Sequence, residues 1–221
     1  MSSKLPITDT TWKVLADCNR EAVKQGWASP GVFGTGVGPA YDSRNQLALL
    51  YVGKSAGPLG TLVGSSFSQT LSGAASTKWM VEKRNKSAFW QMADLIDPSR
   101  RYIAWTNICK MDQVGGSRPP SLRRWRGISE PHLRALREEI RALAPKVVIF
   151  ATSGYCGEAI SSVLEDLGYK SRALGFRDGH TKLTATSDGA FAIETRHPQG
   201  WLSSERNRVV DLAKTLLRRS S

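Results

Sequence analysis

Hydrophobic residues recur at helical spacing in five stretches of the chain. In residues 9–25, Trp12, Leu15 and Ala22 lie three and seven positions apart, and Gly26 ends the pattern. The same periodicity predicts helices over residues 87–96, 129–143, 157–167 and 203–217, and Ser129 is the predicted N-cap of the third helix.

Continuous apolar runs predict the strands. Residues 47–52 are apolar on both faces, as in the centre of a parallel sheet, and 146–151 form a second buried run. Further strands are expected over 102–105, near 173, and over 183–186 and 191–194. Because helices separate the main strands, we predict an α/β fold: a three-layer α/β/α sandwich around a central, mainly parallel sheet. We expect one domain over residues 1–221, in which 1–45 form a helix and a Gly/Pro-rich connector.

Ligands of such folds bind at the carboxyl ends of the strands. Three conspicuous segments follow predicted strands there, namely residues 53–58, 106–110 and 197–201, and we expect them to converge on one edge. Residues 55–76 are rich in Gly, Ser and Ala. This stretch is too poor in large side chains to be core, and we expect it to be a loop suited to the close approach of a ligand.

The charge of the chain favours a nucleic-acid partner. Lys and Arg number 31 against 19 Asp and Glu, a net charge of +12, and the chain has seven Trp. Three scattered Cys without a C-x-x-C pair argue against a disulfide framework or a Cys-based metal site. With no long apolar run, the sequence predicts a cytoplasmic protein without a membrane partner.

The tripeptide GKS at 53–55 also ends nucleotide-binding P-loops, which require G-x-x-x-x-G-K-[ST]. The first glycine of that motif would fall on Ala48, inside the predicted strand, so we expect no nucleotide cofactor. The spacing of Tyr41 and Tyr51 is similar to that of the GIY-YIG nucleases, but the stretch 60–76 lacks the arginine and glutamate of that family.

A different resemblance follows the order of the chain from about residue 45 to the end. The G-x-x-x-G of residues 53–57, the YIAWTNICK of 102–110, the RPP of 118–120, the HLRALREEIRALAPKVVIFAT of 132–152 and the RHPQ of 196–199 come in sequence. Together they resemble the uracil-DNA glycosylase superfamily, and RPP and the 132–152 segment resemble its thermostable branch. That branch carries an iron–sulfur cluster, but here Met111 stands in the place of a required cysteine, so we expect no metal and no cofactor.

The resemblance implies a DNA glycosylase that flips its target nucleotide out of single- or double-stranded DNA. It implies that His197 donates a hydrogen bond to the departing base and that Asn107 reads the base edge or orients water. The alternatives from the residues themselves are a structural histidine and an asparagine that caps a turn.

The chain departs from the superfamily where several branches hold water with an acid or an asparagine. Lys54 and Ser55 stand there instead. Either Lys54 binds phosphate or a substrate substituent while Asn107 or Ser55 positions water, or a desolvated Lys54 attacks C1′ as a nucleophile.

Further residues fill roles that the resemblance implies. Gly53, Gly57 and an apolar side chain of the small-residue loop, Phe67 or Leu62, would line the base pocket, although Phe67 could equally be core. The predicted DNA contacts are Arg118, Arg123, Arg124, Arg126, Gln199, Trp201 and Leu202. Trp201 or Leu202 would fill the gap left by the flipped base, or pack under the last helix.

We therefore expect a monomeric DNA glycosylase that acts on a damaged or modified base. The alternatives are excision of hypermodified bases from foreign phage DNA and a catalytically silent nucleic-acid binding protein on the same fold.

Overall fold

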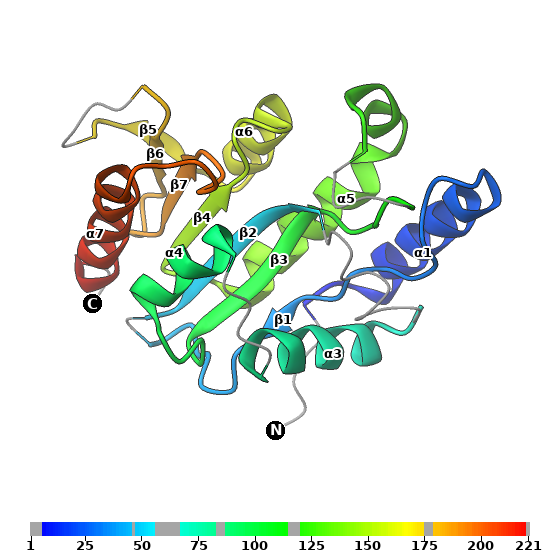
Figure 1. The fold of residues 1–221 in the computed structure, drawn as a ribbon, viewed down its shortest axis with the longest axis horizontal. Helices are drawn as coiled ribbons and strands as arrows, with labels where there is room; N and C mark the ends of the chain where they lie inside the picture. The colour runs from blue at the N-terminus through cyan, green and yellow to red at the C-terminus, as the bar shows by residue number, and fades with distance from the viewer. Residues whose placement is uncertain are drawn as a thin grey trace.

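A seven-stranded mixed sheet forms the centre of the protein (Figure 1). The computed structural model describes residues 6–45, 47–55, 67–82, 87–114, 120–174 and 179–219. The strands are β1 (Gly36–Val37), β2 (Leu49–Ser55), β3 (Ile103–Cys109), β4 (Val147–Ala151), β5 (Lys170–Arg172), β6 (Lys182–Ala185) and β7 (Phe191–Thr195). They lie in the order β1-β3-β2-β4-β7-β6-β5. The middle four, β3, β2, β4 and β7, are parallel, and the outer three pair antiparallel.

Helices cover both faces of the sheet. The described helices are α1 (Asp9–Lys24), α3 (Gln69–Glu82), α4 (Ala88–Ile96), α5 (Leu122–Leu143), α6 (Gly157–Asp166) and α7 (Ser203–Arg219). One face packs against α3, α4 and α7, and the other against α1, α5 and α6 (Figure 1). The predicted α/β class and the parallel centre of the sheet are therefore confirmed.

Each central strand contributes to both cores because alternate side chains point to opposite faces. In β2, Leu49 and Tyr51 join the core under α4 and α7, while Leu50 and Val52 join the core under α5 and α6. All four side chains are inaccessible to solvent. Burial on both faces explains why this run has no polar alternation and could be recognised from the sequence.

The prediction that residues 55–76 form a loop is wrong in part, because α3 begins at Gln69. This helix lies beside β1, and a Cβ on Gly36 would stand 3.0 Å from the backbone of Ser76. The small side chains therefore allow the backbones of a helix and a strand to approach closely. A helix that packs in this way has no stripe of large apolar residues, so periodicity does not detect it.

Three elements extend beyond their predicted ends. Helix α5 begins at Leu122 instead of residue 129, with Ser121 as the N-cap whose hydroxyl accepts from the Arg124 N–H at 3.4 Å. Trp125 is buried in the first turns and packs on His132, with ring centroids 5.5 Å apart, which explains why an arginine-rich segment is helical. Strands β2 and β3 also extend past the predicted ends, so that residues 53–55 and 106–109 belong to the sheet.

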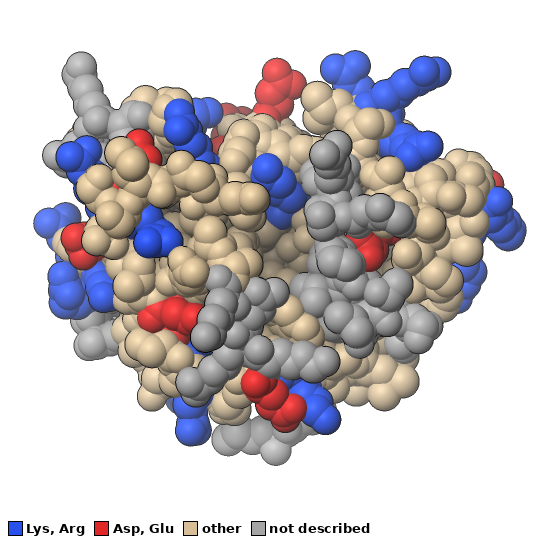
Figure 2. All heavy atoms as spheres, viewed as in Figure 1, with Lys and Arg blue, Asp and Glu red and all other residues tan. Residues whose placement is uncertain are grey.

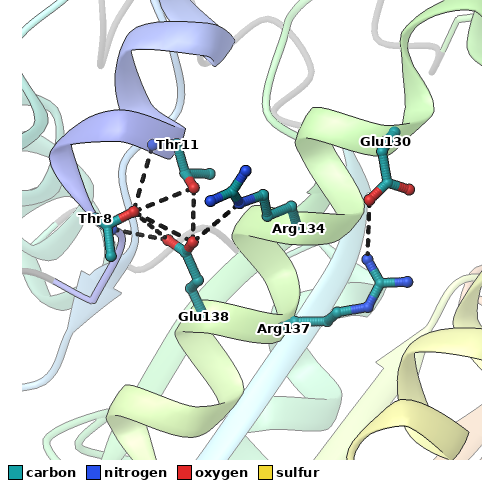
Figure 3. Close-up of polar contacts among 6 residues, drawn as sticks. All are labelled: Thr8, Thr11, Glu130, Arg134, Arg137 and Glu138. Atoms are coloured by element: carbon teal, nitrogen blue, oxygen red, sulfur yellow. Dashed lines mark hydrogen bonds and ion pairs between the residues drawn. The ribbon is translucent and has the colours of Figure 1, made fainter.

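Helix α1 is fixed to α5 by a carboxylate near its N-terminus (Figure 3). Glu138 accepts hydrogen bonds from the Thr8 N–H at 2.8 Å and from the Thr11 hydroxyl at 2.6 Å. The Thr8 hydroxyl caps the helix by accepting from the Thr11 N–H. On α5 itself, Arg134 donates to Glu138 at 3.4 Å. These contacts hold the start of α1 against the second half of α5.

In the described part of the chain, no helix has the length and apolar character needed to cross a membrane.

Candidate active site

The carboxyl ends of the four parallel strands lie at one edge of the sheet. The chain leaves β2 for β3 on one side and later returns to β4 on the other side. This makes the carboxyl end of β2 the topological switch point, where ligands of open α/β sheets bind. Convergence on this edge was predicted for residues 53–58, 106–110 and 197–201. The described residues of these segments end or follow β2, β3 and β7 and therefore lie at this edge, whereas residues 56–58 fall outside the described part of the chain.

Gly53 and Asn107 are paired residues of β2 and β3. A Cβ on Gly53 would overlap the side-chain oxygen of Asn107 and stand 3.4 Å from the Phe89 ring. The missing side chain of Gly53 therefore leaves the space that the Asn107 amide occupies. Tyr51, two residues earlier on the same face, donates its hydroxyl to the Phe89 carbonyl at 2.9 Å and fixes the start of α4 over this space.

The amide of Asn107 is buried with an unused donor. The residue is 2% exposed, and its Nδ2 has no hydrogen-bond partner among the described residues. A buried amide without a partner is unfavourable, and such groups in folded proteins call for a specific explanation. Here the donor lies at the edge where a ligand would bind.

His197 follows β7 and lies against Phe89. The two rings are stacked, with centroids 6.0 Å apart and an interplanar angle of 19°. The His197 N–H donates to the Ser153 hydroxyl at 2.6 Å, which ties the segment after β7 to the turn after β4. The Gln199 N–H donates to Nδ1 of His197 at 3.3 Å, so a neutral ring carries its proton on Nε2.

The electrostatics of the site keep His197 neutral. Burial, and then the positive charge of Lys54, lower the pKa of His197 below its usual range. Burial also lowers the pKa of the Lys54 ammonium, which is half-buried at the end of β2. Ser55, the last residue of β2, is half-buried and pairs with Cys109. Near pH 7 the site therefore offers a neutral imidazole donor close to a positive charge.

No known family model matches the chain, and no curated protein is similar to it in sequence. The resemblance to the uracil-DNA glycosylase superfamily stays a prediction from the motifs alone.

The space-filling view shows a hollow over the carboxyl-terminal parts of β2 and β3, on the face that α4 covers (Figure 2). Gly53 and Asn107 turn toward this face, whereas Lys54 and Thr106 alternate with them along the strands. Within the described residues, no group of three or more His, Cys, Asp or Glu side chains is placed to hold a metal ion. Among the described residues, this edge offers hydrogen bonding by an amide, an imidazole and the Ser55 hydroxyl, together with the charge of a lysine.

Phe89 is the site residue that the sequence did not reveal. Its position in the apolar stripe of residues 87–96 predicts a core residue, and it is indeed 9% exposed. Only the fold shows that its ring lies between Gly53 and His197. The adjacent aromatic residues Phe89 and Trp90 near the start of a predicted helix were the available signal, but core packing explains such a pair equally well.

A buried ion pair behind the site was also not predicted. Lys110 and Glu139 are both inaccessible to solvent, and Nζ lies 2.5 Å from a Glu139 carboxylate oxygen. Thr106 donates to the same carboxylate at 3.0 Å, and Thr35 donates to it as well. The Lys110 backbone N–H donates to Nδ1 of His132 at 3.0 Å. This network anchors β3 from the face opposite Asn107.

Other predicted pocket residues lie apart from this group or outside the described residues. Phe67 packs against α1, where the Trp12 indole donates to its carbonyl at 2.7 Å and Arg20 stands 4.6 Å from its ring centre. The ring is therefore not beside Phe89. Gly57, Leu62 and Arg118 fall outside the described residues.

The predicted DNA contacts that can be placed lie on both sides of the site. Arg123, Arg124 and Arg126 are exposed on the first turns of α5, and Gln199 is exposed after His197. Of the two candidate wedges, Trp201 packs against the core under α7, whereas Leu202 is 69% exposed. Of the two, only Leu202 is exposed enough to serve as the predicted wedge.

The placement of the two tyrosines disfavours a nuclease of the GIY-YIG type. Tyr51 lies in the core on the α4 face with its hydroxyl bonded to a backbone carbonyl. Tyr41 packs on the opposite face and donates its hydroxyl to the Leu143 carbonyl at 3.1 Å. The two hydroxyls therefore do not share a site.

Proposed function

We propose that the protein is a DNA glycosylase that hydrolyses the N-glycosidic bond of a flipped, damaged or modified base. The observation that carries this proposal is the Nδ2 donor of buried Asn107, which has no partner among the described residues. The Asn107 amide lies against Gly53, close to Phe89, on which the neutral His197 stacks. The order of the sequence motifs supports it, and the positive charge of the chain supports a DNA partner.

The two donors fit the charge that develops in this reaction. Cleavage of an N-glycosidic bond leaves electron density on the base and oxocarbenium character on the sugar. Nε2–H of His197 can donate to a base carbonyl as that carbonyl becomes negative, and Nδ2 of Asn107 can donate to the base edge. The nearby Lys54 charge stabilises an anionic leaving base and disfavours protonation of His197.

The water that attacks C1′ must donate a hydrogen bond to a protein acceptor that orients it. The described residues of this site include no carboxylate that could be this acceptor. Ser55 and the side-chain oxygen of Asn107 are the acceptors within the site, so we assign water positioning to them. Lys54 then contacts a substrate group instead of acting as a base. A half-buried lysine at the base pocket can bind a polar or anionic substituent on the base. We therefore propose two substrate classes, simple damaged bases and hypermodified bases such as those of foreign phage DNA.

A base-release assay tests the proposal. Oligonucleotides that carry uracil, hypoxanthine, 5-hydroxymethylcytosine or a glucosylated cytosine are incubated with the protein, and abasic sites are revealed by cleavage in alkali. We expect strand cleavage with at least one modified substrate. Release of no base from any of them, together with salt-sensitive DNA binding, would instead identify a catalytically silent binding protein.

Two variants test the site once a substrate is found. His197→Ala and Asn107→Ala each remove one donor, and we expect each to lower the rate by about 100-fold to 1000-fold. The matched control is His180→Ala, a histidine exposed on the surface near β6. If His197→Ala and His180→Ala are equally active, the assigned site is wrong, although the protein is still a DNA glycosylase.

A further inference from the structure

A groove of about 820 Å³ runs between the end of α1 and the start of α5, and none of its lining residues belongs to the candidate active site. Its floor is apolar, and its walls carry an aromatic ring and two guanidinium groups. The lining residues that matter here are Cys18, Ala22, Trp27, Arg123, Arg124 and Ile128. Glu138 fixes the other end of α1 to the second half of α5 (Figure 3).

Trp27 is held in place while one part of its ring stays accessible. Its indole N–H donates to the side-chain oxygen of Gln25 at 3.2 Å, and its carbonyl accepts from the Val114 N–H at 3.0 Å. The residue is half-buried. The Arg124 guanidinium stands over the ring at 5.4 Å from the centroid. This is a loose cation–π contact of an exposed side chain, which can move to a phosphate when a base takes its place on the ring.

The groove is strongly positive. Arg123, Arg124 and Arg126 are exposed, and none of them forms an ion pair in the described part of the chain. Glu21 is the acidic lining residue among those described, and it is engaged by Lys24 at 3.9 Å and by the Gln25 amide at 3.0 Å. Figure 2 shows basic side chains gathered over the first turns of α5. The surface therefore complements a polyanion.

The groove borders the edge that carries the candidate site. Val114, which contacts Trp27, follows the end of β3 closely in the chain, and α5 begins beyond the next segment. The end of α1 and the start of α5 both lie beyond the carboxyl end of β3 (Figure 1). A DNA strand that places a base at Asn107 can therefore continue past β3 into the groove.

We propose that this groove binds an unpaired nucleotide of single-stranded DNA. The base stacks on Trp27, and the phosphates on either side of it contact Arg123 and Arg124. Stacking on an aromatic ring requires a base that is not paired, and aromatic side chains beside a basic groove are how proteins bind single strands. This proposal rests on the proposed function only for its assumption that the ligand is DNA. It adds that the protein prefers single-stranded to double-stranded DNA.

Fluorescence anisotropy with a short oligothymidylate tests this proposal. The comparison ligands are the matched duplex and an oligomer of the same length whose residues lack bases. We expect the intact protein to prefer the single strand over both. Trp27→Ala should weaken oligothymidylate binding by about 5-fold to 100-fold, leave the abasic oligomer unaffected, and be rescued by Trp27→Phe.

The arginines are tested through the salt dependence of the same binding. Replacing Arg123 and Arg124 together by alanine should lower the slope of log K against log salt by about 1.4, since each phosphate contact to a single strand contributes about 0.7. Arg141→Ala, an exposed arginine at the other end of α5, is the control and should change neither affinity nor slope. The groove assignment fails if Trp27→Ala binds oligothymidylate as tightly as the intact protein.

These outcomes are independent of the excision assay. If the intact protein releases no base but Trp27→Ala loses single-strand binding, the groove assignment is supported and the proposed glycosylase function is refuted. If the intact protein excises a base but Trp27→Ala binds single strands normally, the glycosylase function is supported and the groove assignment is refuted.

Discussion

Glu139→Gln should destabilise the protein by about 3–5 kcal/mol, although the new side chain has almost the same shape. Glu139 is the counter-charge of Lys110, and both side chains are completely buried. Burial lowers the pKa of Lys110, and the Glu139 carboxylate opposes that shift. Without the carboxylate, the lysine must either stay charged in the core or lose its proton on folding.

The second route sets an upper limit to the loss. Neutralising a lysine of ordinary pKa about 10.4 at pH 7 costs about 4.6 kcal/mol, because each pH unit corresponds to about 1.36 kcal/mol. A domain of ordinary stability has about 5–15 kcal/mol in total, so Glu139→Gln should be folded but much weakened. Raising the pH should restore stability, because the unfolded lysine binds a proton that the folded neutral lysine lacks. The gain is about 1.4 kcal/mol per pH unit between pH 7 and 9.

Urea unfolding at pH 7 and pH 9 measures both effects. Glu138→Gln is the matched control, because the Glu138 carboxylate is partly exposed and water can replace the acceptor oxygen that glutamine lacks. We expect this control to lose less than about 1 kcal/mol. A Glu139→Gln variant that is as stable as the control at pH 7, or whose loss does not shrink at pH 9, would show that Lys110 does not depend on Glu139 for its charge.

Three further predictions concern the site. Gly53→Ala should lower base excision at least tenfold while the protein stays folded, because the new Cβ displaces the Asn107 amide; unchanged excision kinetics would show that this amide is not used. Lys54→Ala should raise the pKa of His197, since a positive neighbour and part of its burial are removed. The acidic limb of the kcat/KM profile then moves to higher pH, and a limb at the same or lower pH contradicts this. Leu202→Ala should leave the melting temperature almost unchanged, because the side chain is 69% exposed, and should reduce excision from duplex more than from single-stranded DNA. Equal losses on both substrates would remove Leu202 as the wedge.

The sequence predicted the elements whose burial leaves a strong pattern. Strand β2 is apolar on both faces, and α7 carries its buried residues at helical spacing, so both were found within a few residues of their observed ends. Helix α3 packs through small residues and has no such pattern. The first turns of α5 are rich in arginine and have no apolar stripe. The packing of Trp125 on His132, which stabilises these turns, cannot be read from the sequence.

The site could be predicted only in part, for a related reason. His197 and Asn107 are polar residues next to predicted strands, so their chemistry stood out in the sequence. Gly53 was placed in a loop because glycine is a turn residue, whereas here it is a strand residue that leaves space for the neighbouring strand's amide. Contacts between residues far apart in the chain, such as Lys110 with Glu139, leave no periodic signal in either partner.

Consecutive residues of β3 point to opposite faces of the sheet and have different roles, one in stability and one in the candidate site. Thr106 faces α5 and is bonded to the Glu139 carboxylate, whereas Nδ2 of Asn107, on the opposite face, has no partner among the described residues. An unsatisfied buried amide costs about 1–3 kcal/mol, which an apolar side chain in this position would avoid. The Lys110–Glu139 network holds the strand from behind, so β3 stays in place although this donor contributes nothing to its stability. A ligand that accepts hydrogen bonds can satisfy the Asn107 donor beside the neutral imidazole, and the carbonyl edge of a nucleobase is such a ligand.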